Sequence, residues 1–104
     1  MYEFSFFYRP EIVYELSLKA LQRKKKFEVI YFDQTKRTIF AKQKSTWVRP
    51  EIELQIYIHA ISEQQTEVEV KTILKKKGLT IKGKNKAELQ FFQSLFNCFD
   101  ILSP

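Results

Sequence analysis

Apolar and polar residues alternate along two runs in the second half of this chain, residues 51–59 and 67–72. A period of two is the pattern of a strand that buries one face and exposes the other. The polar segment 62–65 between the runs indicates a loop, so the two runs predict an antiparallel hairpin. The apolar set is Ile52, Leu54, Ile56, Ile58, Val68, Val70 and Thr72, and the polar set is Glu51, Glu53, Gln55, Tyr57, His59, Glu67, Glu69 and Lys71.

The register of this hairpin follows from the same pattern. Both apolar sets lie on one face only if the numbers of paired residues have an even sum, which places Ile56 and Ile58 opposite members of the other apolar set. On the polar face, this register places His59 near Glu67 or Glu69. An imidazole beside a carboxylate is an arrangement that catalysis uses, but we expect an ordinary cross-strand surface pair here.

The beginning of the chain predicts a strand and a helix. Apolar and polar residues alternate over residues 2–8, and the predicted strand ends at Arg9-Pro10. Pro10 suits the first turn of a helix, and apolar residues continue from there at helical spacing. The basic run 23–26 follows, and cations are favoured at the carboxyl end of a helix, so we expect the helix to span 10–26.

A second hairpin follows this helix. Residues 27–32 are rich in β-branched and aromatic side chains, which favour a strand, and 37–42 continue the pattern. The polar segment 33–36 predicts the turn between them. Residues 45–50 then connect this hairpin to the alternating runs.

The end of the chain predicts a second helix. A short extended piece, 79–81, leads through Gly83 to Asn85, and Asn85 with Glu88 three residues later is a variant of the capping box. We therefore expect a helix over 85–101 that lies across the sheet. Its expected apolar stripe is Leu89, Phe92, Leu95, Phe96, Phe99 and Leu102.

Together these elements predict one α+β domain that covers residues 1–104, in the order strand, helix, four strands, helix (β-α-β-β-β-β-α). The strands form an antiparallel sheet of about four to six strands, with both helices packed on one face. The other face of the sheet is expected to be acidic and solvated.

The composition limits which catalytic and metal-binding sites the chain can form. The chain of 104 residues contains one histidine, His59, and one cysteine, Cys98. These are too few for the usual ligands of a zinc site, and no catalytic constellation is recognisable, so we predict no enzyme, no metal and no cofactor. Cys98 lies in the apolar run of the last helix and is expected to pack as a small hydrophobic residue.

The same features predict a compartment. A lone cysteine cannot form an internal disulfide, and the first residues lack the pattern of a secretory signal, so we expect a cytoplasmic protein. No apolar run approaches the roughly 20 residues that span a bilayer, so no membrane span is expected.

The formal charge of +6 favours anionic partners. The segment from Lys82 to Lys86 is a candidate anion-binding site, because a helix amino end offers free N–H groups and Lys82, Lys84, Asn85 and Lys86 surround it. Nucleic-acid binding by the sheet is not favoured, since its polar face carries several glutamates. A basic edge formed by 23–26 and 75–86 is an alternative phosphate-binding surface, with strong salt dependence.

Two apolar features are candidates for binding. Trp47, in the third connection, is a candidate anchor for a protein partner, because tryptophan is enriched in binding hot spots. Phe92, Phe96 and Phe99 are candidates for lining an apolar ligand cavity between the sheet and the last helix. The alternative for both features is a place in the hydrophobic core.

The element order resembles the β-α-β4-α layout of TATA-binding-protein-like folds, the group that includes helix-grip ligand-binding proteins similar to the birch-pollen-allergen superfamily. The segment Gly83-Lys84-Asn85-Lys86 also looks like a motif in small uncharacterised bacterial proteins of similar layout. The resemblance implies a fold and assigns no functional residue, because fold does not determine function.

Three functional hypotheses remain. The first is a small non-enzymatic module for binding or protein interaction, self-associating through a sheet edge, where unpaired backbone groups invite pairing. The second is binding of a small apolar, lipid-like ligand between the sheet and the last helix. The third is weak binding of anions or nucleic acid by the basic edge.

Overall fold

The computed structural model describes residues 2–43, 51–76, 79–83 and 86–102. The predicted α+β class and element order are confirmed, and the extended piece expected at 79–81 lies within a further strand, β6. The elements are β1 (Tyr2–Phe6), α1 (Pro10–Gln22), β2 (Phe27–Asp33), β3 (Thr38–Gln43), β4 (Ile52–Ser62), β5 (Gln65–Lys76), β6 (Leu79–Gly83) and α2 (Lys86–Leu102).

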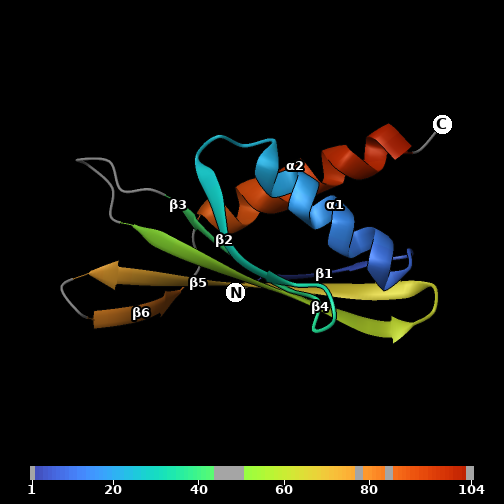
Figure 1. Cartoon of the computed structure of the whole chain (residues 1–104), viewed down its shortest axis with the longest axis horizontal. Coiled ribbons are helices and arrows are strands. Elements are labelled where there is room, and N and C mark those ends of the chain that lie inside the picture. The colour runs from blue at the N-terminus through green and yellow to red at the C-terminus, as the bar shows by residue number, and fades with distance from the viewer. Residues whose placement is uncertain (1, 44–50, 77–78, 84–85, 103–104) are drawn as a thin grey trace.

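The strands form one antiparallel sheet in the order β1-β5-β4-β3-β2 (Figure 1). Strand β5 is long enough to pair with two strands along the same edge. β1 pairs with its first part, from Thr66 to Val70, and β6 pairs with its second part, from Thr72 to Lys76. The sheet is therefore five strands wide, and β1 and β6 share one edge position.

The register of the β4–β5 hairpin agrees with the sequence pattern. Ile56 lies opposite Val70, and Ile58 lies opposite Val68. All four side chains are buried. The even-sum rule is confirmed because a shift by one residue would have moved one complete apolar set to the solvated face.

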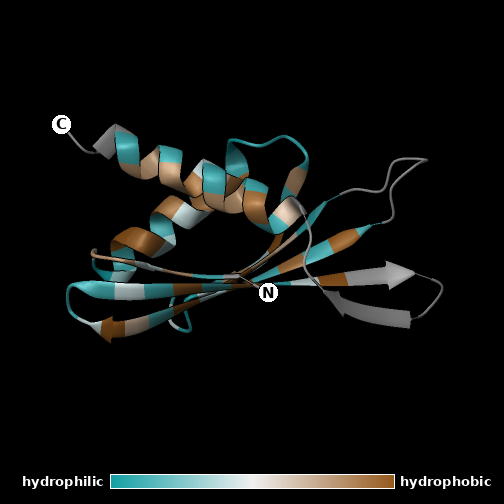
Figure 2. Cartoon of the chain, turned by 180° about the vertical axis from the view of Figure 1, so that it is seen from behind, coloured by the Kyte–Doolittle hydropathy of each residue, from teal (hydrophilic) through white to brown (hydrophobic). Residues whose placement is uncertain are grey.

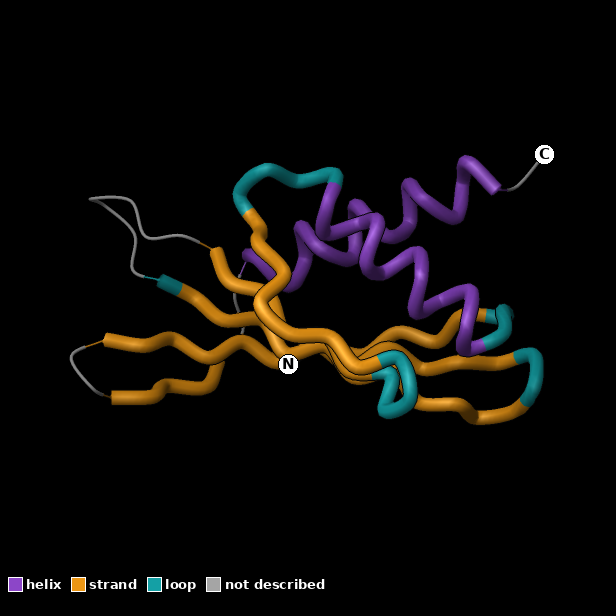
Figure 3. Tube along the Cα trace, in the orientation of Figure 1, coloured by secondary structure: helices purple, strands orange, loops and turns teal. Residues whose placement is uncertain are grey.

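Both helices cover the same face of the sheet, which gives a molecule of two layers (Figure 3). Apolar residues alternate with polar ones along the strands, and both helices carry apolar residues between polar ones (Figure 2). The Ser94 hydroxyl of α2 donates a hydrogen bond of 2.9 Å to the Ala20 carbonyl of α1, in a place where both residues are buried. The core therefore lies between the helix layer and the sheet.

The first helix is shorter than predicted. It ends at Gln22, with Arg23 as its C-cap, and the basic run 23–26 forms the turn into β2. The Arg23 N–H donates to the Lys19 carbonyl, and the Phe27 N–H donates to the Lys24 carbonyl. The physical reason is the next strand: Phe27 is only 6% exposed, so the chain must leave the helix in time to bring this ring into the core.

The apolar stripe of α2 is rotated from the predicted one. Leu89 and Phe96 were expected to be buried, yet they are 47% and 39% exposed. Phe91, which the predicted stripe omits, is fully buried, and Cys98 is buried as expected. The rotation arises because α2 contacts both α1 and the sheet, so its buried face is set by two neighbours. Asn85, the expected cap, lies outside the described residues.

Tyr14 of α1 gives a stability prediction. Its side chain is buried, and its hydroxyl has no hydrogen-bond partner among the described residues. Replacement by phenylalanine is expected to raise the free energy of unfolding by about 1–2 kcal/mol, because it removes an unpaired buried polar group. Urea unfolding at neutral pH measures this change, and a loss of stability would show that the hydroxyl has a partner.

The stability of the protein should also depend on pH through Tyr14, and the same variant tests this. Burial raises the pKa of Tyr14 above its usual value of 10.0, and the nearby charges of Asp33 and Tyr31 raise it further. The folded-state pKa is higher than the unfolded value. The contribution of Tyr14 to stability is therefore fully present below the unfolded pKa and is lost as the pH rises through the folded-state pKa. When the pH is raised from neutral to above 10, the free energy of unfolding should fall less for Tyr14→Phe than for the wild type.

Candidate functional site

No described element covers the face of the sheet opposite the helices (Figure 3). We call this surface the open face. The register of the strands places alternate residues on it, and these residues are exposed or half-buried. Those whose side chains the structure describes are Glu3, Ser5, Glu28, Tyr31, Asp33, Thr38, Phe40, Lys42, Glu53, Gln55, Tyr57, His59, Glu67, Glu69, Lys71 and Ile73.

A row of aromatic rings crosses the open face from β2 to β4. The ring centroids of Tyr31 and Phe40 lie 5.3 Å apart, those of Phe40 and Tyr57 6.1 Å apart, and those of Tyr57 and His59 6.5 Å apart. Tyr31 is 42% exposed. We call these four residues the aromatic row. Rings at these separations interact with one another, and each of the four residues is exposed or half-buried.

A β-bulge brings Tyr31 into this row. Val29 pairs with Ala41, but Tyr31 pairs with Phe40, so the register shifts by one residue at Ile30. Without the shift, Tyr31 would lie opposite Ile39 and point to the core. A bulge re-aims the side chains that follow it, and here it places Tyr31 on the open face.

Hydrogen bonds along β4 orient the central ring. The Tyr57 hydroxyl donates to Gln55 Oε1 at 3.1 Å, and Gln55 Nε2 donates to Glu53 Oε2 at 2.9 Å. These residues lie two apart on one strand, so their side chains share a face. The chain of bonds fixes the direction of the Tyr57 hydroxyl.

Charged groups surround the central ring. Lys71 Nζ lies 5.3 Å from the centroid of Tyr57 and 4.0 Å from Glu69 Oε1. An ammonium group within about 6 Å of a ring centroid makes a cation–π contact. His59 Nε2 lies 3.4 Å from the same Glu69 oxygen. The prediction that His59 lies near Glu67 or Glu69 is confirmed: it pairs with Glu67 in register and contacts Glu69 through its side chain.

At the β2 end of the row, Tyr31 lies beside a carboxylate. The Tyr31 hydroxyl donates to Asp33 Oδ2 at 3.4 Å, and the Lys36 N–H donates to Asp33 Oδ1 at 3.0 Å. The hydrogen bond from the Lys36 backbone is the main cause that lowers the pKa of Asp33. Asp33 is therefore ionised across the neutral range, and its stabilising contribution is lost only as the pH falls through this lowered pKa.

The open face is acidic, as predicted, but it is also aromatic. The sequence pattern includes Tyr57 and His59 in the polar set, whereas Tyr31 and Phe40 were assigned only to strands. Their place on the open face depends on the pairing of β2 with β3 and on the bulge. The exposed aromatic residues of the second hairpin are the sequence signal that could have indicated this surface.

The phenylalanines proposed as a ligand lining lie between β1 and α2. The Phe92 centroid is 4.6 Å from that of Phe4, and the Phe99 centroid is 4.7 Å from that of Phe6. Phe96 is partly exposed but also contacts Phe4, at 5.4 Å. Since these rings pack against one another, a ligand between them would have to displace them, and the cavity stays a prediction.

The anion site and the partner anchor predicted from the sequence involve residues or side chains that the structure does not describe. Trp47, Lys84 and Asn85 lie outside the described residues, and the side chains of Lys82 and Lys86 are outside it as well. The anion site and the partner anchor therefore stay predictions. Among the described residues, no group of three or more His, Cys, Asp and Glu could hold a metal ion. None of the described helices is both long and apolar enough to cross a bilayer.

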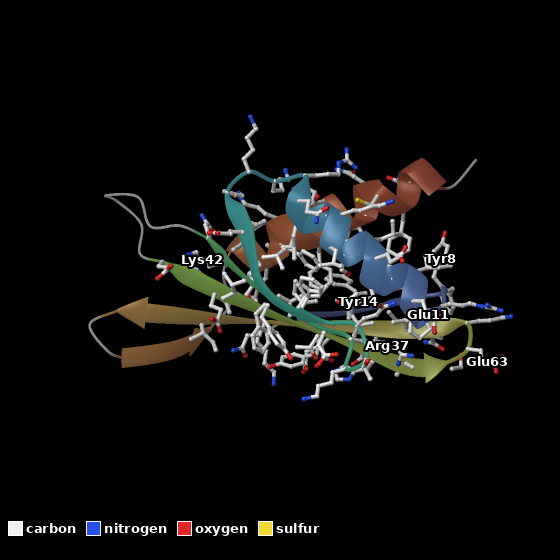
Figure 4. The ribbon with its side chains drawn as sticks, in the orientation of Figure 1. Tyr8, Glu11, Tyr14, Arg37, Lys42 and Glu63 are labelled. Atoms are coloured by element: carbon white, nitrogen blue, oxygen red, sulfur yellow. The ribbon has the colours of Figure 1, made fainter. Side chains whose placement is uncertain are left out.

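A hollow of about 400 Å³ lies at the end of the sheet near the start of α1, and sequence reasoning missed it. Arg37 Nη2 lies 3.7 Å from Glu11 Oε1 across it, and Arg37 adopts a positive φ of 50°. Figure 4 shows Glu11, Arg37 and Glu63 near one another at this end. The lining is Arg9, Pro10, Glu11, Arg37, Ala60, Ser62 and Glu63, which mixes both signs of charge and selects no single ligand class.

Comparisons with known proteins add little to this picture. No protein-family model matches the chain. No curated protein matches it either. Among solved structures, the crystal structure of a DUF4468 family protein from Bacteroides ovatus is similar over 97% of this chain and 80% of that chain, with 12% sequence identity and a TM-score of 0.39. A likeness of this degree carries no argument about function.

Proposed function

We propose that this chain is a small, non-enzymatic binding module for a protein partner, and that the open face is its binding surface. The observation that carries the proposal is the aromatic row, which lies on a sheet face that no described helix covers. A solvated sheet face that only served solubility would carry mostly polar side chains, with exposed apolar ones scattered singly and not in a row. Exposed rings on rigid strands are instead typical of the residues that supply most of the energy in protein interfaces.

The backbone of the open face also suits binding. Two of the strands that carry the aromatic row, β3 and β4, are held from both sides, because they lie in the middle of the sheet. Side chains on such strands need little ordering when a partner binds, so less conformational entropy is lost. This rigidity supports recognition by the aromatic row and not by a loop that folds on contact.

Amide chemical shifts of ¹⁵N-labelled protein test the proposal. The probes are a lysine oligopeptide, a glutamate oligopeptide, a neutral apolar peptide and a single-stranded oligonucleotide. At least one of the three peptides is expected to shift the amides around Tyr31, Phe40 and Tyr57, and the oligonucleotide is not. The double variant Tyr31→Ser, Tyr57→Ser should abolish the effect. Phe7→Ser is the matched control, because Phe7 is 80% exposed but lies outside the open face. Shifts confined to other surfaces, or no shifts at all, would overturn the proposal.

Self-association is a second candidate, favoured by the edge strand β2. Ile30 and Phe32 are 46% and 62% exposed on a strand that pairs along one edge only, within the part of the chain that the structure describes. An antiparallel two-fold pairing of β2 with a second copy would bring the basic turn 23–26 of one chain towards Asp33 of the other. Sedimentation velocity should then give a dimer in low salt that Ile30→Pro abolishes. A wild-type monomer at high concentration would exclude this candidate.

The resemblance to TATA-binding-protein-like and helix-grip folds stays a prediction. It supports binding as the class of function only by analogy of layout. The proposal above depends on the open face alone.

A further inference from the structure

The open face has a charge opposite to that of the whole chain. Among its described residues the carboxylates outnumber the lysines: Glu3, Glu28, Asp33, Glu53, Glu67 and Glu69 against Lys42 and Lys71. The formal charge of the chain as a whole is +6, which is opposite in sign to the sum over these described residues. The local field at the open face therefore attracts cations and repels phosphates.

The open face already holds one cation in a defined geometry. The Lys71 ammonium lies over the Tyr57 ring and beside Glu69, with the ring and the carboxylate oxygen at 5.3 and 4.0 Å. A ring and a carboxylate around one ammonium are the two groups that recognise lysine or arginine side chains in proteins. The Lys71 side chain is 40% exposed, so solvent screens its contacts and an external cation could compete with it for the ring and the carboxylate.

A second ring and carboxylate lie at the other end of the row. The Tyr31 hydroxyl contacts Asp33, which is ionised at neutral pH, and the Tyr31 ring is exposed. Phe40 lies between the two ends and contacts both tyrosines. An extended segment with positively charged side chains could therefore contact both ends and lay its apolar stems on Phe40.

We propose that the open face binds a cationic segment of a protein partner, one that carries lysine or arginine side chains. The inference rests on the proposed function and names the chemistry of the partner. It assigns Tyr57 and Glu69 as the central cation site, Tyr31 and Asp33 as the second, and Lys71 as a competing internal cation.

Affinity measurements on defined probes test this assignment. The probes are a lysine oligopeptide and the same peptide with every lysine acetylated, which has the same length but no side-chain charge. Wild-type protein should bind the first and not the second. Binding should weaken as the salt concentration rises, because the attraction is between charges near the surface.

Two variants separate this account from a structural role. Tyr57→Leu keeps an apolar side chain but loses the ring face, and it should weaken binding of the lysine oligopeptide about five- to tenfold. Lys71→Met removes the competing cation, and it should tighten binding about threefold or more. A substitution that only disturbed the fold would not improve affinity. Phe7→Ser should leave affinity unchanged, and unfolding curves of each variant show that it is folded.

The outcomes distinguish this inference from the proposed function. Equal binding of the acetylated peptide, or weaker or unchanged binding by Lys71→Met, would overturn the cationic assignment. If the glutamate peptide or the neutral apolar peptide shifts the open-face amides and the lysine oligopeptide does not, the partner chemistry is wrong but the binding surface stands. If only the oligonucleotide shifts them, the proposal of a protein partner fails as well. If no probe shifts these amides, both proposals fail.

Discussion

Replacing Phe92 with alanine is expected to lower the free energy of unfolding by about 3–5 kcal/mol. Phe92 is 1% exposed, and its ring contacts those of Phe4 and Phe91 at centroid distances of 4.6 and 5.4 Å. Removing it leaves a cavity that the neighbouring rings can fill only in part. Denaturant unfolding at neutral pH measures the loss.

Phe96→Ala is the matched control. Phe96 lies on the same helix and contacts Phe92, but it is 39% exposed. Phe96→Ala should lower the free energy of unfolding by only about 1–2 kcal/mol, since a partly exposed ring buries less apolar area on folding. If Phe92→Ala instead cost as little as Phe96→Ala, and the wild type bound fatty acids, the rings would line a ligand cavity and the second functional hypothesis would replace the proposed one.

A proline at Gln55 is expected to prevent folding. Gln55 lies in β4 and pairs with Phe40 on one side and Lys71 on the other. Proline removes a backbone N–H and is excluded from central strands, so its cost approaches the whole stability of a small domain, about 5–15 kcal/mol. Circular dichroism and amide spectra of the purified variant report the loss of the fold.

Two variants control for this result. Gln55→Ala changes only a half-buried side chain on the open face and should cost about 1 kcal/mol or less. Ile30→Pro places proline at the bulge of edge strand β2, where no cross-strand partner is assigned, and should be tolerated. A folded Gln55→Pro variant would contradict the central position of β4 in the sheet.

The strongest sequence signal was the alternation in β4 and β5. It predicted the register correctly, because an error of one residue would expose a complete apolar set such as Ile56 with its neighbours. The α2 stripe was predicted less well. A single amphipathic period assumes one buried face, whereas Phe91 and Ser94 are both buried on a helix that has two neighbours.

Sequence periodicity could not predict the aromatic row. Alternation alone places Tyr31 and Phe32 on opposite faces of β2, but it does not say which face each one takes. That depends on the bulge at Ile30, which no turn or glycine signal marks in the sequence. Contacts between strands also decide that Phe40 lies between Tyr31 and Tyr57, and such contacts depend on pairing and not on local pattern.

Hydroxyl-radical footprinting with and without the lysine oligopeptide tests the role of the open face most directly. In the free protein, Tyr31 should be oxidised much faster than Tyr14, because the two tyrosines are 42% and 4% exposed. On addition of the peptide, Tyr31 and Tyr57 should become protected while Phe7 keeps its rate. Protection of Phe7 with unchanged rates at Tyr31 and Tyr57 would contradict the assignment of the open face as the binding surface.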